Sequence, residues 1–171
     1  MYLAFDAHYT TDGSRLVAAE FHDWTDPAPA RLRVWPAGPA ADYEPGQFYK
    51  RELPPLLTAL KEYDLATVKA IVIDGYVYLN AEGRPGLGHY LYAALDEAVP
   101  VVGVAKSYFR DTNAERVLRG KSTKPLFVTA AGMDPAAAAD HLRAMAGNFR
   151  MPDLLAAVDR LTKAPEADRE N

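Results

Sequence analysis

The chain has 171 residues, of which 49% are hydrophobic and 25% are charged, and its formal net charge at pH 7 is −4. This length and composition predict a folded globular protein rather than a disordered one, and the acidic balance argues against a generic polyanion binder. Because there are no cysteines, disulfides and cysteine-ligated metal sites are excluded, and any metal must use oxygen or histidine ligands.

The first third of the chain predicts a β-hairpin unit and a helix. Strands are expected over 2–8 and 15–22, joined by a turn at 11–14, and a short third strand is expected over 31–35. Leucines at helical spacing predict a helix over 49–63. Pro54 and Pro55 fit only the first turn of such a helix, because proline lacks the backbone N–H.

The rest of the chain alternates between strands and helices. The apolar, β-branched segment 68–74 predicts a strand that is covered on both faces. Further strands are expected over 99–104 and 125–128. Helices are expected over 86–95, 135–146 and 152–163, and Asp134-Pro135 is a typical helix start.

This order of elements predicts an α/β fold with a mixed central sheet flanked by helices. No linker or internal repeat divides the chain, so one domain is expected over residues 1–163, followed by a charged, disordered tail over 164–171. No apolar run approaches the ~18 residues of a membrane span, and the start lacks a leader pattern. A cytoplasmic protein with no membrane partner is therefore expected, with a monomer favoured.

Three acidic residues stand out by their context. Asp6 and Asp74 each end a short apolar run, and Glu52 follows the unusual string 43–51. A carboxylate at the end of a buried strand is costly unless a cation pairs with it, so the three acids suggest a divalent-metal site. Taken singly, each acid has an ordinary alternative as a turn or surface residue.

The segment from Lys106 to Lys124 is strongly basic. Six basic residues face only two acidic ones, with Tyr108 and Phe109 between them. Such a mixture is compatible with nucleic-acid contact, but a solvated loop or hairpin is the favoured interpretation of the segment alone.

Several strings, taken together and in this order, resemble the endonuclease V family. They are Phe5-Asp6-Ala7-His8-Tyr9, Tyr43-Glu44-Pro45-Gly46-Gln47-Phe48-Tyr49-Lys50-Arg51-Glu52, Val72-Ile73-Asp74-Gly75 and Gly103-Val104-Ala105-Lys106. The resemblance continues with Gly86-Leu87, Phe149-Arg150-Met151-Pro152 and Asp159-Arg160-Leu161, so that it extends from about residue 2 to residue 163.

The resemblance implies a ribonuclease H-like fold and an endonuclease that cuts DNA or RNA near deaminated bases such as inosine, as part of nucleic-acid repair. It implies that Asp6, Glu52 and Asp74 are catalytic residues that hold Mg²⁺ or Mn²⁺. It also implies that Lys106 is catalytic and lies near the scissile phosphate, where an ammonium group provides a point charge.

The same resemblance implies a set of nucleic-acid-binding residues. Tyr43 and Pro45 would belong to a wedge that separates the strands at the lesion, since an aromatic ring and a rigid proline suit that task. Gly46, Phe48 and Gly75 would line a pocket for an extruded base. The ordinary alternative is that Pro45 begins a Pro-Gly turn against which Tyr43 packs, and that the glycines serve turns.

Two positions depart from the family pattern. Asn80 stands where the family has a histidine after the Asp-Gly strand end, and it is expected to contact nucleic acid through hydrogen bonds alone. Met133 stands where a second histidine would fall, and methionine is a poor ligand for Mg²⁺. Asp134 could supply a replacement acid, although a role as helix N-cap is favoured.

These observations predict a metal-dependent endonuclease. The alternative is a catalytically impaired relative that binds nucleic acid or a protein partner without cleaving. The replaced histidines favour the alternative, whereas the three retained acids favour the enzyme.

Overall fold

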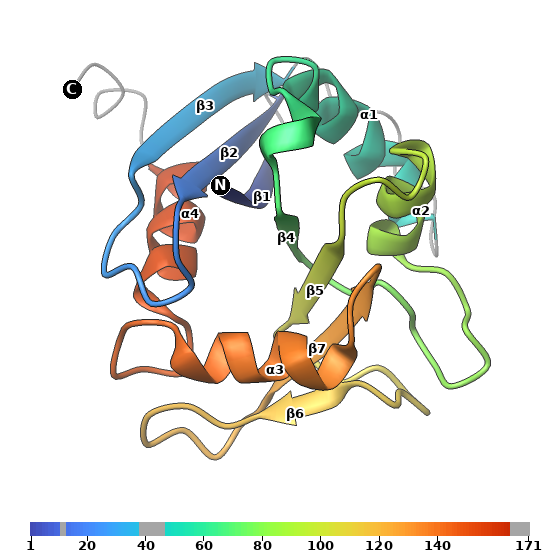
Figure 1. The fold of residues 1–171 in the computed structure, drawn as a ribbon, viewed down its shortest axis with the longest axis vertical. Coiled ribbons are helices and arrows are strands. Elements are labelled where there is room, and N and C mark those ends of the chain that lie inside the picture. Colours follow the sequence, from blue (N-terminus) through green and yellow to red (C-terminus); the bar gives the residue numbers. More distant parts are fainter. Residues whose placement is uncertain (11–12, 38–46, 165–171) are drawn as a thin grey trace.

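A computed structural model describes residues 1–10, 13–37 and 47–164. Their central feature is a mixed sheet in the order β3-β2-β1-β4-β5-β7-β6 (Figure 1). Its strands are β1 (Tyr2–Thr10), β2 (Gly13–Phe21), β3 (Arg31–Ala37), β4 (Ala70–Asp74), β5 (Val101–Ala105), β6 (Glu115–Val117) and β7 (Leu126–Ala131). Strands β1, β4 and β5 are parallel to one another, whereas β2 and β7 run antiparallel to their neighbours.

Helices cover both faces of this sheet. They are α1 (Phe48–Leu60), α2 (Leu87–Ala94), α3 (Pro135–Ala144) and α4 (Asp153–Lys163), with a short 3₁₀ helix, η1 (Leu65–Thr67), before β4. Buried residues of α1 and α2 pack in one core cluster, and those of α3 and α4 pack in the other. Because side chains alternate along a strand, Ile71 and Ile73 enter the first cluster, whereas Ala70 and Val72 enter the second.

The predicted α/β class and the order of the elements are confirmed, with most boundaries within a few residues. The prediction for Pro54 and Pro55 is wrong, because both lie inside α1 rather than in its first turn. The buried side chains of Leu56 and Leu60 attach this helix to the sheet, and such packing outweighs the missing backbone hydrogen bonds. The basic segment contains the short strand β6, which continues as a hairpin into β7.

Within the described ranges, no helix is long and apolar enough to cross a membrane. The predicted tail falls largely outside these ranges, since α4 ends at Lys163 and the description ends one residue later.

Candidate active site

Strand register places three charged residues at one edge of the sheet. Parallel pairing of β1 with β4 stops just before Asp6, Asp74 is the last paired residue of β4, and Lys106 directly follows β5. The first strand, expected over 2–8, extends to Thr10 as β1, so Asp6 lies within the strand rather than at its end. The continuation pairs only with β2, so Asp6 still lies where the parallel part of the sheet ends.

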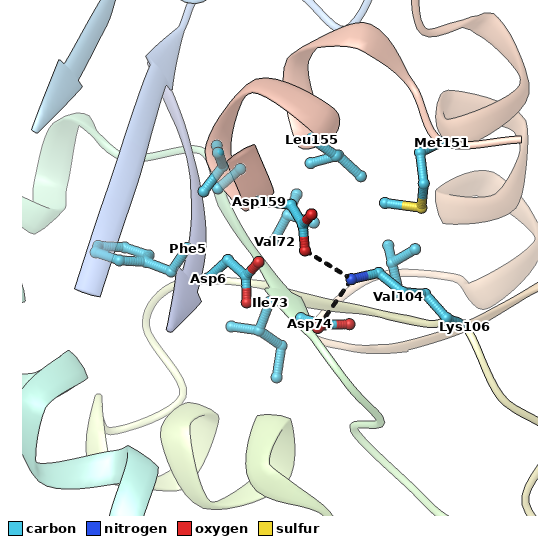
Figure 2. A pocket seen from close by; sticks show the side chains of 12 residues that line it. Phe5, Asp6, Val72, Ile73, Asp74, Val104, Lys106, Met151, Leu155 and Asp159 are labelled. Atoms are coloured by element: carbon cyan, nitrogen blue, oxygen red, sulfur yellow. Dashed lines mark hydrogen bonds and ion pairs between the residues drawn. The ribbon is translucent and has the colours of Figure 1, made fainter. Parts of the chain in front are cut away.

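All three charged side chains belong to the face of the sheet that α4 covers. The residues two positions before them belong to the core cluster of α3 and α4; they are Ala4, Val72 and Val104. Alternation along each strand then directs the charged side chains to the same side. Figure 2 shows them together beneath α4, whose Asp159 points toward Lys106.

Lys106 connects two of the acids. Its Nζ lies 3.3 Å from Oδ2 of Asp74 and 3.2 Å from Oδ1 of Asp159 (Figure 2). Asp159 is also bonded by Lys163, one helical turn further along α4, at 2.8 Å. Asp6, Asp74, Lys106 and Asp159 are called the acid–lysine group below.

Glu52 reaches this group from the opposite side of the sheet. It lies on α1, which packs in the other core cluster, yet Glu52, Asp6 and Asp74 line one small cavity together. The structure thus brings all three sequence-predicted acids to the same place, two from strands and one from a helix.

The local environment perturbs the charges of the acids. The pKa of Asp6 is raised to about 7, first because its carboxyl group is buried and second because Asp74 is nearby. Burial and the charge of Asp74 likewise raise the pKa of Glu52 to about 7. For Lys106, burial lowers the pKa, but the negative charges led by Asp74 outweigh it and raise the pKa above its ordinary value.

Stability does not explain this arrangement. The ion pairs of Lys106 join side chains that are 27–42% exposed, and pairs of that kind contribute at most about 1 kcal/mol. Carboxyl groups with raised pKa values destabilise the fold wherever they are ionised. A buried, charge-perturbed group of this type, next to a cavity, is typical of a functional site.

The acids are not preassembled as a three-ligand metal cage. Among the residues that the structure describes, no group of three or more His, Asp or Glu side chains is arranged to hold a metal ion. Glu52 comes from the other layer, and the Asp74 carboxylate is already bonded by Lys106. The carboxylate oxygens still suit Mg²⁺, which usually takes one or two protein carboxylates and completes its shell with water and phosphate oxygens.

A larger cavity of about 390 Å³ adjoins the acids. Asp74 and Glu52 lie on its inner wall, and the aromatic residues that line it are Tyr49, Tyr76 and Phe109. Tyr76 is fixed there, since its hydroxyl donates to the Ser107 carbonyl at 2.7 Å and accepts from the Phe109 N–H. The volume and the mostly apolar walls are typical of a site for a small molecule or for one group of a larger one.

Gly103 determines the path of the chain behind this cavity. A Cβ atom at position 103 would lie 2.5 Å from the Gly75 carbonyl oxygen and 2.8 Å from Oγ1 of Thr129. The segment after β4 therefore crosses directly over β5, where the Val77 N–H donates to Thr129 Oγ1 at 2.8 Å. Gly75 itself has φ +130° and lines the cavity, a conformation that favours glycine.

The structure describes only part of the predicted nucleic-acid-binding set. Tyr43, Pro45 and Gly46 lie outside the described residues, and for Phe48 only the backbone, at the start of α1, is described. Asn80 lies in the loop before α2, where its Oδ1 accepts a hydrogen bond from the Arg84 N–H at 3.0 Å.

The second departure from the family pattern has a local explanation. Met133 is partly buried and packs against the core cluster of α3 and α4. Asp134 is the N-cap of α3 and accepts from the Ala136 N–H. The favoured interpretation of Asp134 is therefore confirmed.

Sequence reasoning assigned no site role to Asp159. Its signal lay in α4, where Leu155 and Val158 are buried and an acid one turn after Leu155 falls on the side that faces the sheet. An aspartate on the inner face of an amphipathic helix is unusual enough to be a candidate.

Comparison with known proteins is consistent with this picture. Residues 3–139 match the endonuclease V family. The structure is similar to human ENDOV, with a TM-score of 0.70 and 20% identity over 95% of this chain and 82% of that one. The structure is also similar to endonuclease V from Ciona intestinalis in complex with an inosine-containing DNA. The TM-score is 0.72, and the identity is 18% over 95% of this chain and 83% of that one.

Endonuclease V from Streptomyces avermitilis gives a TM-score of 0.63 and 22% identity over 95% of this chain and 79% of that one. No curated protein matches the sequence. The fold is thus ribonuclease H-like. Since the family match covers most of the chain, this protein belongs to the endonuclease V family, a family of nucleases.

Proposed function

We propose that the protein is a cytoplasmic, divalent-metal-dependent endonuclease that cleaves a phosphodiester bond in DNA or RNA near a deaminated base such as inosine. The observation that carries the proposal is the convergence of Asp6, Asp74, Lys106 and Asp159, from four separate elements, beside one cavity. Because the chain belongs to a nuclease family, we interpret this cluster as a site for phosphodiester cleavage.

Asp6 and Asp74 are proposed to hold Mg²⁺ or Mn²⁺, with Glu52 completing the set from α1. When bound, such an ion activates water and stabilises charge on the leaving oxygen. The raised pKa values of Asp6 and Glu52 support this assignment. The ionised forms of both groups are disfavoured by burial and by the charge of Asp74, and a bound cation would stabilise them.

Each protein group has a distinct part in the proposed reaction. Glu52 is proposed to orient a water molecule in the site, as the third acid of the set. Lys106 places its ammonium group on a non-bridging phosphate oxygen. Asp159 positions Lys106 through the 3.2 Å ion pair, so that the ammonium group keeps its place when phosphate replaces Asp74 as its partner.

The large cavity is proposed to take the extruded base. Tyr76 and Phe109 offer ring faces for stacking, and the backbone of Gly75 allows close approach. Endonuclease V of Ciona intestinalis has been crystallised with an inosine-containing DNA, and this chain shares its fold. The nucleic acid is also proposed to contact the residues just before the first cavity residue, Tyr49; they are Tyr43, Pro45, Gly46 and Phe48. Asn80 is proposed to donate a hydrogen bond to the nucleic acid from its amide group.

A cleavage assay tests the proposal. Inosine-containing single- and double-stranded DNA and RNA, labelled at either end, are incubated with Mg²⁺ or Mn²⁺ and the wild-type protein or Asp74→Ala. The matched control is Asp140→Ala, which removes an exposed acid of α3 whose partner is Arg143. Metal-dependent cutting by the wild type and the control, and none by Asp74→Ala, is the expected result.

The same assay decides against the alternative. Binding of the oligonucleotides without cutting under any condition would identify the catalytically impaired relative, which the replacement of two family histidines by Asn80 and Met133 favours. Cutting that survives Asp74→Ala would show that the acid–lysine group is not the active site.

A further inference from the structure

Two loops lie side by side at the sheet edge that carries Lys106 (Figure 1). The loop 118–125 connects β6 to β7, and the loop 145–152 connects α3 to α4. Because β7 runs antiparallel to β5, the end of β5 pairs with the beginning of β7. The loop 118–125 is therefore level with Lys106.

Buried Arg119 fastens the two loops together. Its residue is 6% exposed, and its guanidinium group donates to the carbonyl oxygens of Met145, Ala146, Gly147 and Phe149. Gly120, with φ +60°, brings the backbones into contact, since a Cβ there would lie 2.3 Å from the Asn148 carbonyl oxygen. A buried guanidinium is costly unless it is hydrogen-bonded, so this charge serves to fix the backbone on which Phe149 stands.

The side chains presented on this fixed backbone are unusually exposed. Phe149 is 75% exposed and Leu118 is 62% exposed, the two highest values among the large hydrophobic residues that the structure describes. An aromatic ring held in water on a rigid support is the arrangement on which proteins stack nucleobases.

The electrostatics of the surface match a nucleic-acid strand. The loop 118–125 contains no acidic residue, and its Lys121 and Lys124 are exposed. Arg150, next to Phe149, donates to the carbonyl oxygens of Lys106 and Lys124, so the surface is joined directly to the acid–lysine group. The exposed lysines belong to a loop that packs against the backbone at Phe149, and such cations complement the phosphates that flank a base.

We propose that Phe149, with Lys121 and Lys124, forms a stacking platform for an unpaired base of the substrate strand, outside the cavity that takes the extruded base. The platform rests on the proposed function, because it binds the same substrate at a second place. Stacking on Phe149 holds one base, while the two lysines bind phosphates beside it.

Binding measured without metal separates this platform from cleavage. Fluorescence anisotropy of labelled single-stranded DNA and RNA, in EDTA, compares the wild type with Phe149→Ala and Phe149→Tyr. The matched control is Leu32→Ala, an exposed apolar residue of β3 at the opposite edge of the sheet. Thermal unfolding of each variant confirms that it is folded.

Phe149→Ala is expected to raise Kd by roughly tenfold or more, whereas Phe149→Tyr and Leu32→Ala stay near the wild type. Lys121→Gln should reduce the slope of log K against log salt by about 0.7. With 2-aminopurine placed at successive positions of the strand, the wild type should quench its fluorescence at one position. Phe149→Ala should not quench the fluorescence at that position.

Equal affinity of Phe149→Ala and the wild type would overturn the platform while leaving cleavage, measured separately, intact. Binding that depends on Phe149 in a protein that never cuts would overturn the nuclease proposal alone. Absence of any binding by the wild type would overturn the platform as well.

Discussion

The acid–lysine group and the positions of Asn80 and Met133 use their residues in opposite ways. In the first region, Asp6 is partly buried next to another acid, and its pKa is raised to about 7. In the second, Asn80 closes a turn and Met133 packs against the core. The first arrangement costs stability at neutral pH, and the second adds to it.

This difference indicates where a functional demand still acts on the chain. A cluster that destabilises the fold on its own can be compensated by the binding of a metal ion or a phosphate. Asn80 and Met133 serve local structure and need no such compensation. The contrast is consistent with the proposed role of the acid–lysine group in binding a metal ion and phosphate.

The largest expected effect is that of Asp6→Asn. Cleavage should fall by at least about 100-fold, because a charged group at the reacting centre is lost. The same variant should unfold at a higher temperature than the wild type at pH 8 without metal, since it removes a carboxylate that is disfavoured there. Quantitative cleavage and calorimetry check both results, and an unchanged cleavage rate would exclude Asp6 from the site.

The two lysines that bond Asp159 provide the next test. Lys106→Met should reduce cleavage by on the order of 10²-fold, because Lys106 also faces Asp74 and the proposed phosphate. Lys163→Met removes a bond of 2.8 Å to the same acid but should change the rate by less than about threefold. Equal losses in the two variants would mean that Asp159, rather than Lys106, is the critical partner.

An intermediate effect is expected from pH. Because the pKa values of Asp6 and Glu52 are raised to about 7, the folded protein binds more protons than the unfolded chain between about pH 4 and pH 7. Without metal, this contribution should lower the unfolding temperature as pH rises through that range. Mg²⁺ should then stabilise the protein more at pH 8 than at pH 6, where it competes with protons.

Asp6→Asn serves as the control for this pH dependence, because it removes one of the two titrating groups. Thermal unfolding scans at several pH values, with Mg²⁺ and with EDTA, measure the effect. An Mg²⁺-induced shift that is equal at pH 6 and pH 8 would contradict the assignment of these acids as ligands.

The smallest effect on catalysis is expected from Met133→Ala. Loss of a partly buried side chain packed against the core should cost about 1 kcal/mol of stability and leave the cleavage rate within about twofold. A large loss of rate at unchanged stability would show that the position retains a catalytic role despite its chemistry.

Much of the fold and of the site could be predicted from the sequence. Asp74 ends an apolar strand, Lys106 follows one, and Asp6 lies where the parallel pairing of β1 stops. Parallel strands bring such positions to one edge whatever the details of packing. Asp159 could not be assigned in the same way, because a helix is free to face any side until its packing is known. Pro54 and Pro55 mislead for a related reason, since tertiary contacts of α1 override a local preference.

Gly103 has a consequence for motion. Since no side chain separates β5 from the chain that crosses it, the floor of the large cavity rests on the sheet backbone and shares its stiffness. The Val77 amide is buried and bonded to Thr129 beneath this crossing, so slow hydrogen exchange is expected there. A base bound in the proposed pocket would therefore contact a backbone that is fixed to the sheet.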